Sequence, residues 1–446
     1  MATLPDTLPP AVKRKDPARP RLRAASSAPA VLPSWLRAQS INVNRHAAAL
    51  RPFRREEFGT GPASPSEGHI QVVNELITKL RGGLFEMSKK VAGSVAEARQ
   101  EPRSANLLSV VRHKDTAHKW VQGIEKIWDF YFELFGQRQS MPHGEWLLSC
   151  DRIAMDCYQT MFTNLGIAKS IPAPPPFCFM RTGFAPATIR RGIAIRKLGQ
   201  QLNPFPLVQL PYHRLINPWT LGAVMHEVSH NLQTELGLSK VIPHSVALRL
   251  LKARMGRSVA SVWARWNREM FADMNALLLG GPEVVGSLMD VVGRAPALVF
   301  GFNPHGVHPT PYLRTLISVE LLRRMGFPDE AEEYRRAWTR IYSNPRAGNI
   351  PEDMLKTFPE ACALAVDAMC FQPYKTLGNK SLAQVVHFKK KDQEIVEEAA
   401  RRLAAGTDPG IVPERYLIGA SRIALNRRLA RPGVIAQKFY LELVRR

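Results

Sequence analysis

The sequence predicts a mostly helical α+β protein in which a small β-sheet lies beside one central helix. Most of the chain carries apolar residues three and four positions apart, which is typical of amphipathic helices. Residues 171–215 differ, because prolines interrupt the helical pattern and short strand-like runs follow. Since these runs are few, we expect the sheet to be a minor part of the fold.

Changes in composition predict four regions. Residues 1–66 are rich in Pro and Arg and have few apolar anchors, so we expect a disordered basic tail. Helical periodicity fills residues 67–170, which we expect to form an N-terminal helical region. Residues 171–330 contain the strand-like runs and the motifs described below, and residues 331–446 are predicted to form a C-terminal helical region.

The net charge bears on the kinds of partner that this protein could contact. The formal charge is +23, which favours contact with nucleic acid, anionic membranes or acidic proteins. No zinc-finger, RNP or helix–turn–helix pattern accompanies the charge, so the sequence does not favour a nucleic-acid partner.

The 5 cysteines form no CxxC pair, which indicates buried free thiols in a reducing compartment. Because no apolar run can cross a bilayer and no secretory signal is visible, we expect a soluble cytoplasmic protein. The sequence does not indicate an oligomeric state.

Three strand-like segments precede the central helix: residues 177–184 (FCFMRTGF), 188–198 (TIRRGIAIRKL) and 205–215 (FPLVQLPYHRL). The second alternates apolar and basic residues around Ile193 and Ile195, as a half-exposed strand does. Pro206 and Pro211 predict that the third is short or lies at a sheet edge, because proline cannot donate to a strand ladder.

The central helix carries His226-Glu227-x-x-His230 within residues 217–237. On a helix, residues four apart lie on the same face, so both imidazoles can point at one ion. Zinc accepts such nitrogens at about 2.0–2.1 Å. Glu227 is offset around the helix and can reach a zinc-bound water, which is the position a general base needs. The pattern therefore predicts a zinc site in which Glu227 activates that water.

A third ligand is needed. The extended pattern HExxHxxGxxH does not continue, because Gln233 and Leu236 occupy its Gly and third His places. The next predicted helix carries Glu269 and Asp273, which share a face and lie in apolar surroundings that make unpaired charge costly. We predict that Glu269 completes a His₂Glu site with one open position. Asp273 is then expected to accept the second N–H of a ligand histidine, most simply His226.

These motifs resemble the gluzincin (HExxH…ExxxD) zinc metallopeptidases. His308-Pro309 with the downstream Arg314 is similar to a motif of the CAAX-protease/HtpX-like branch and its small soluble relatives. The resemblance covers residues 217–320 and implies a zincin-like core with the sheet beside the HExxH helix. It implies that Zn²⁺ is bound by His226, His230 and Glu269, that Glu227 is the base, that Asp273 supports the ligands, and that His308 or Arg314 lies near the substrate carbonyl or braces the site. Membrane members of the family carry transmembrane helices and this sequence has none, so the substrate is not implied.

We therefore expect a zinc metallopeptidase that hydrolyses a peptide or protein substrate, with Glu227 and His308 in catalytic roles. A substrate strand is expected to pair with the third predicted strand. His213 and Tyr312 remain alternatives to His308 as donors to the oxyanion, and His305 is a further alternative to His308. Two other hypotheses stay open: a catalytically idle zincin-fold protein that binds or regulates, and a basic nucleic-acid-binding protein with a chance motif.

Overall fold

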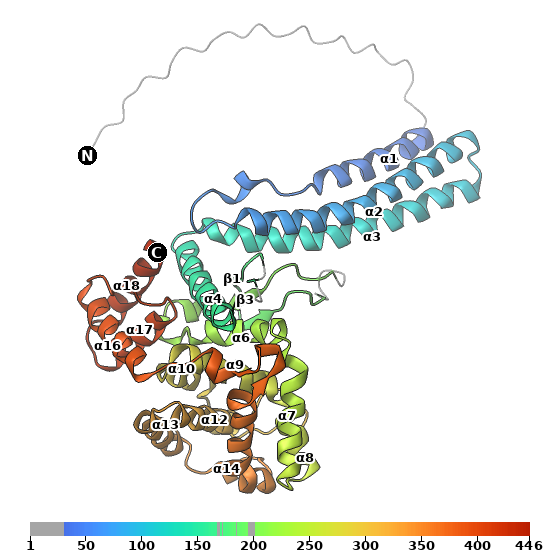
Figure 1. The fold of residues 1–446 in the computed structure, drawn as a ribbon. Coiled ribbons are helices and arrows are strands. Elements are labelled where there is room, and N and C mark those ends of the chain that lie inside the picture. The colour runs from blue at the N-terminus through green and yellow to red at the C-terminus, as the bar shows by residue number, and fades with distance from the viewer. Residues whose placement is uncertain (1–30, 167–169, 172, 184, 195–200) are drawn as a thin grey trace, which may run out of the picture. The chain divides into compact units, whose positions relative to one another are not determined.

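The computed structural model describes residues 31–166, 170–171, 173–183, 185–194 and 201–446. Within these ranges the protein is mostly helical with a small sheet, as predicted (Figure 1). The described residues divide into two compact units, one of residues 31–49 and 83–120 and one of the described residues of 50–82 and 121–446. The predicted boundaries at residues 170 and 330 do not separate compact units, because one apolar core extends from Leu147 to Leu443.

The smaller unit is built from α1 (Val31–Ala49) and from the adjoining parts of α2 (Glu67–Gln100) and α3 (Ser104–Gly136). Leu36, Val43 and Ala47 of α1 are buried, and Ser88 Oγ of α2 donates a hydrogen bond to Asn44 Oδ1. The prediction of a disordered tail is thus wrong for residues 31–66, since apolar residues four and seven apart give α1 a face to bury. Residues 1–30 lie outside the described residues.

The larger unit contains the remaining elements. Its strands are β1 (Phe177–Met180), β2 (Ala187–Ile189), β3 (Leu207–Leu210), β4 (Pro373–Tyr374) and β5 (Lys380–Ser381). Its helices are α4 (His143–Leu165), α5 (Tyr212–Leu215), α6 (Gly222–Glu235), α7 (Leu238–Lys252), α8 (Arg257–Arg265), α9 (Asn267–Gly280), α10 (Glu283–Val292), α11 (Pro296–Val299), α12 (Pro311–Arg324), α13 (Pro328–Ile341), α14 (Glu352–Val366), α15 (Leu382–Val385), α16 (Lys390–Ala405), α17 (Tyr416–Asn426) and α18 (Pro432–Arg445).

The sheet beside α6 has the order β1-β3-β2. β3 pairs in parallel with β1 and antiparallel with β2, so it is short, as predicted, but central and not at an edge. Pro206 and Pro211 are compatible with this place because they flank the four paired residues and interrupt no ladder. The second strand ends at Ile189; Ile193 follows a turn beyond it, and Ile195 falls outside the described residues.

The two faces of this sheet pack on different helices. Phe177, Phe179 and Leu207 join an aromatic cluster with residues of α2 and α3 that belong to the larger unit. Cys178 and Val208 point the other way, into the core that contains α4 and α6. This alternation is the period-two pattern of a strand that is buried on both faces, and it fixes the sheet against the helix that carries the histidines.

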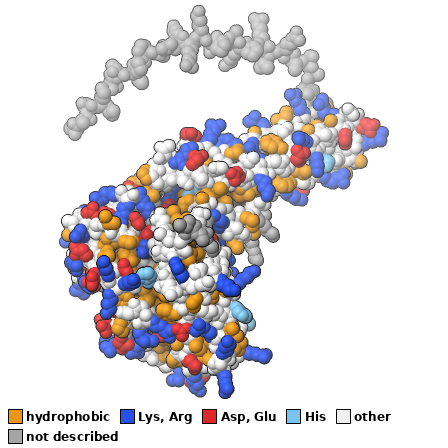
Figure 2. Space-filling model, in the orientation of Figure 1, with side chains coloured by type: hydrophobic (Ala, Val, Ile, Leu, Met, Phe, Trp, Pro, Cys, Tyr) orange, Lys and Arg blue, Asp and Glu red, His pale blue; other side chains and the backbone are white. Residues whose placement is uncertain are grey.

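Charge on the surface is mixed in sign. On the face shown in Figure 2, Lys and Arg side chains are interspersed with Asp and Glu. The cysteines are all free and buried, as predicted, including Cys150 and Cys157 on one face of α4. In the part of the chain that the structure describes, every helix is too short or too polar to cross a membrane.

A buried ion pair joins α4 to the loop before α17. Arg415 Nη1 donates to Asp156 Oδ1 at 2.7 Å, and the Arg415 backbone N–H donates to Asp156 Oδ2 at 3.0 Å. Arg415 Nε also donates to the carbonyl of Leu279, at the end of α9, at 2.9 Å. The pair therefore connects three segments that lie far apart in the sequence.

Replacing Asp156 with Ala should destabilise the larger unit by about 3–5 kcal/mol, because it leaves the Arg415 guanidinium buried without its counter-charge. Chemical denaturation of the Asp156→Ala protein measures the effect as a lower midpoint. Glu332→Ala is the control, since Glu332 pairs with Arg335 and Arg336 at the surface and its loss should leave the midpoint almost unchanged. Equal midpoints for the wild type and Asp156→Ala would show that the ion pair does not stabilise the fold.

Candidate metal centre

The site is built on two antiparallel helices, α6 and α9. Gln233 Nε2 of α6 donates to Asn267 Oδ1 of α9 at 3.1 Å, and one turn earlier in α6 Ser229 Oγ accepts from Asn275 Nδ2 at 2.7 Å. These buried hydrogen bonds set the register of the two helices. The register brings the face of α6 that carries His226 opposite the first turns of α9.

The structure brings the three predicted ligands together. The donor atoms of His226, His230 and Glu269 all lie within 4.8 Å of one another. His226 Nε2 is 3.4 Å from Glu269 Oε2, and His230 Nε2 is 3.5 Å from Glu269 Oε1. The two imidazole planes are inclined at 86°, so their nitrogens approach a common point from different directions.

The two contacts to Glu269 are longer than direct hydrogen bonds and close to the spacing of two ligands of one tetrahedral ion, while the donor atoms as a set lie within 4.8 Å. Charge-assisted N–H···O⁻ hydrogen bonds are about 2.7–2.9 Å long. Two ligands at about 2.0–2.1 Å from a tetrahedral ion lie about 3.4 Å apart. Glu269 is only 8% exposed, and both its oxygens have their histidine neighbours at 3.4–3.5 Å. Two imidazoles and one carboxylate also form a donor set that suits Zn²⁺.

Asp273 and Arg314 contact the predicted ligands His226 and Glu269 and hold them in place. Asp273 Oδ1 lies 2.8 Å from His226 Nδ1, so the contact predicted from the spacing is present and Nε2 is the nitrogen left for an ion. Arg314 of α12 donates to Asp273 through Nε at 2.6 Å and through Nη2 at 2.9 Å. Its Nη2 is also 3.4 Å from Glu269 Oε2. Arg314 therefore braces the site, which was one of its two predicted positions.

Burial and neighbouring charges set the protonation of the ligands. Burial lowers the pKa of His230 to about 3, with help from His226, so His230 is a neutral imidazole at pH 7. Burial also acts to lower the pKa of His226, but Asp273 and Glu269 outweigh it and raise the value to about 10. Burial acts to raise the pKa of Glu269, but His226, Arg314 and His230 hold it below its ordinary value. Glu269 is therefore ionised, as a metal ligand must be.

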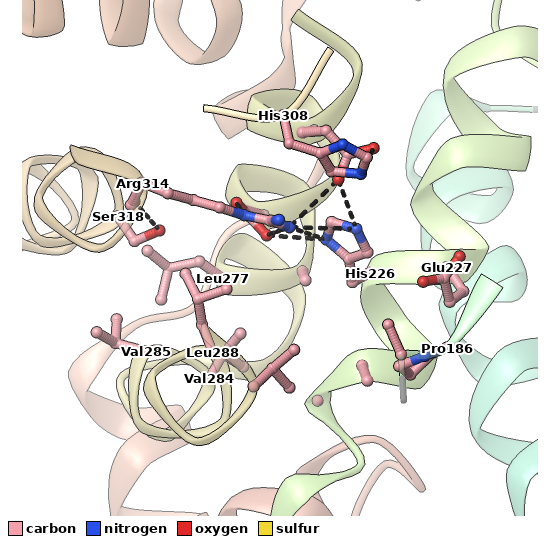
Figure 3. Close-up of a pocket in the computed structure, with 17 residues that line it drawn as sticks. Pro186, His226, Glu227, Leu277, Val284, Val285, Leu288, His308, Arg314 and Ser318 are labelled. Carbon is pink, nitrogen blue, oxygen red and sulfur yellow. Dashed lines mark hydrogen bonds and ion pairs between the residues drawn. The ribbon is translucent and has the colours of Figure 1, made fainter. Parts of the chain in front are cut away.

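Glu227 lines the same pocket as His226 and Glu269. In Figure 3, Glu227 and Arg314 lie on opposite sides of His226, with Glu227 beside Pro186. Its side chain is buried, and the loss of hydration raises its pKa to about 7. A carboxyl group with this pKa can both accept and release a proton at neutral pH.

His308 is the predicted histidine that reaches the site from the loop before α12. Its Nε2 is 3.4 Å from Glu269 Oε1, while its side chain is 65% exposed. His308 lines the pocket, and among the described lining residues neither His305 nor His213 appears. Tyr312 is also absent from the lining; its ring packs on Phe300 in the core. The geometry favours His308 over the three alternatives.

Two features of the site were not predicted. Thr188 of β2 donates through Oγ1 to the carbonyl of Glu227 at 2.8 Å, which attaches the sheet edge to α6. Gln233 is 1% exposed and holds Asn267, two positions before Glu269. The only sequence signal for the contact between Gln233 and Asn267 was the presence of a glutamine where the extended motif has glycine.

The comparisons with known proteins identify no relative: no protein family, no curated protein and no solved structure matches this chain. The interpretation of the site therefore depends on the geometry of its residues.

Changing Asp273 to Asn should weaken zinc binding by roughly 10–100-fold, because His226 loses the carboxylate that orients its ring and strengthens its basicity. Competition with a chelator measures the zinc affinity of the purified variant. Asp290→Asn is the matched control, since Asp290 pairs with Arg422 at the surface of α10 and does not line the pocket. Equal zinc affinity of Asp273→Asn and the wild type would remove Asp273 from the support of the site.

Proposed function

We propose that this protein is a zinc-dependent metallopeptidase, with His226, His230 and Glu269 as ligands and Glu227 as the general base. The observation that supports it most is the convergence of two imidazole nitrogens on the buried Glu269 carboxylate at 3.4–3.5 Å. Three protein ligands leave a fourth position open, which is typical of a catalytic zinc site and not of a structural one.

The chemistry of the site suits hydrolysis. When bound, zinc would supply a Lewis acid that polarises the scissile carbonyl and makes a water molecule acidic near pH 7. Glu227 takes a proton from the attacking water and then gives it to the leaving amine, which its pKa of about 7 permits. His308 Nε2 lies on the exposed side of Glu269 and donates to the negative charge that develops on the carbonyl oxygen. Arg314 keeps Glu269 and Asp273 ionised and in place.

The substrate is expected to pair with β2 and not with β3. β3 is paired on both sides, so the earlier expectation that a substrate strand adds to it is wrong. β2 is at the edge of the sheet, and Ala185 and Pro186, which precede it, line the pocket. A peptide that adds to the outer edge of β2 would pass directly over the pocket.

Purified protein is expected to contain about one zinc ion per chain. The double change His226→Ala and His230→Ala should remove it, since one carboxylate cannot hold the ion alone. Elemental analysis after exhaustive dialysis measures the content, and His305→Ala is the control because His305 lies outside the pocket lining. Full zinc retention by the double variant would exclude this site.

Glu227→Gln should keep the zinc and lower the rate of peptide cleavage by about 10²–10⁴-fold, because the amide cannot accept the proton. Digestion of a broad peptide library, with zinc analysis of the same sample, measures both properties. Unchanged turnover would exclude Glu227 as the base. A wild-type protein that holds zinc and cleaves no peptide would instead favour the catalytically idle alternative.

A further inference from the structure

The pocket at the metal centre has a second, apolar side. Besides His226, Glu227 and Glu269 it is lined by six aliphatic side chains of α9 and α10, here called the apolar wall: Ala276, Leu277, Val284, Val285, Leu288 and Val291. Figure 3 shows Leu277, Val284, Val285 and Leu288 grouped together, apart from the polar cluster around His226. One cavity therefore presents reactive groups on one side and a hydrocarbon surface on the other.

The apolar wall offers no charged partner to a ligand. Arg314 is engaged by Asp273 and Glu269, so its charge is already neutralised. Ser318, the hydroxyl residue of the lining, donates to the carbonyl of Arg314 at 3.3 Å. A charged side chain placed against this wall would lose its hydration without gaining a counter-charge. An apolar side chain would gain contact area at no such cost.

The size of the cavity sets an upper limit. Its volume is about 150 Å³. Apolar cavities of about this volume accept a benzene ring. Val284 and Val285 are buried and form a fixed back, whereas Leu288 and Val291 are only partly buried and lie closer to solvent. The buried valines cannot move apart without disturbing the core, so we expect the wall to favour side chains no larger than a phenyl ring.

We propose that the apolar wall selects peptide substrates that carry a medium-sized apolar side chain, such as leucine, methionine or phenylalanine, next to the scissile bond. Leu288 is a partly buried residue of the wall, so it is the position at which a substitution can change the size of side chain that fits. This inference rests on the proposed peptidase function, since the side chain enters the pocket only when the backbone lies at the metal centre.

A library of peptides that varies both residues flanking the scissile bond tests the proposal with the zinc-loaded protein. At one of the two positions, Leu, Met and Phe should be cleaved at least about tenfold better than Ala, Asp, Lys or Trp. Leu288→Ala should shift the preference toward Phe and Trp, and Leu288→Trp should shift it toward Ala and Val. Leu355→Ala is the control, because Leu355 is a partly buried leucine of the same core outside the pocket and should leave the preference unchanged.

Opposite shifts in the two Leu288 variants cannot come from a general loss of stability, which would lower all rates together. Cleavage with no apolar preference, or with a preference that neither variant alters, would overturn the proposal and leave the peptidase function intact.

Binding provides a readout that needs no turnover. Isothermal titration of the Glu227→Gln protein with two fixed peptides that differ only in carrying Leu or Asp at the variable position should show at least about tenfold tighter binding of the Leu peptide. If the wild type cleaves nothing, the peptidase function fails, and this titration alone decides the pocket. Binding that favours the apolar peptide and weakens in Leu288→Trp would support the apolar wall; equal or no binding would overturn it.

Discussion

The buried carboxylate of Glu269 is the group on which the site depends. It lies between three imidazoles and a guanidinium, and it is 8% exposed. With Asp273, it places two negative charges in the core against the single positive charge of Arg314. Burying such charges is costly unless they are balanced. One unit of negative charge is therefore left for a proton on His226 or for a cation to neutralise.

The same charge balance explains the opposite behaviour of the two ligand histidines. His226 contacts both carboxylates, and they raise its pKa to about 10. His230 contacts Glu269 alone and faces His226, so burial dominates and its pKa falls to about 3. A cation that binds here replaces the proton of His226 and meets a neutral His230 with no proton to displace. The two histidines thus reach different protonation states, although they come from one short motif.

The grouping of the site residues could be predicted from the sequence further than their surroundings could. Helix geometry fixes which residues share a face, so the pairs His226–His230 and Glu269–Asp273 followed from spacings of four, whereas the expectation that the two pairs meet came from the need for a third ligand. The central place of β3 did not follow, because flanking prolines are equally compatible with a short strand inside a sheet. The packing of residues 31–49 was missed because their buried side chains are few and widely spaced, and the adjoining Pro- and Arg-rich stretch dominated the composition.

The apolar wall illustrates a second limit of prediction from the sequence. Val284, Val285 and Leu288 have the pattern of ordinary core residues, and most aliphatic side chains of this chain are indeed buried in the core. Whether an aliphatic side chain faces another helix or a cavity depends on the register between helices, which buried polar contacts such as Gln233–Asn267 and Ser229–Asn275 set here. Such contacts join residues 34 and 46 positions apart, and no local pattern announces them. Spacing therefore predicts which polar residues share a helix face, whereas the three-dimensional register decides which side chains surround them.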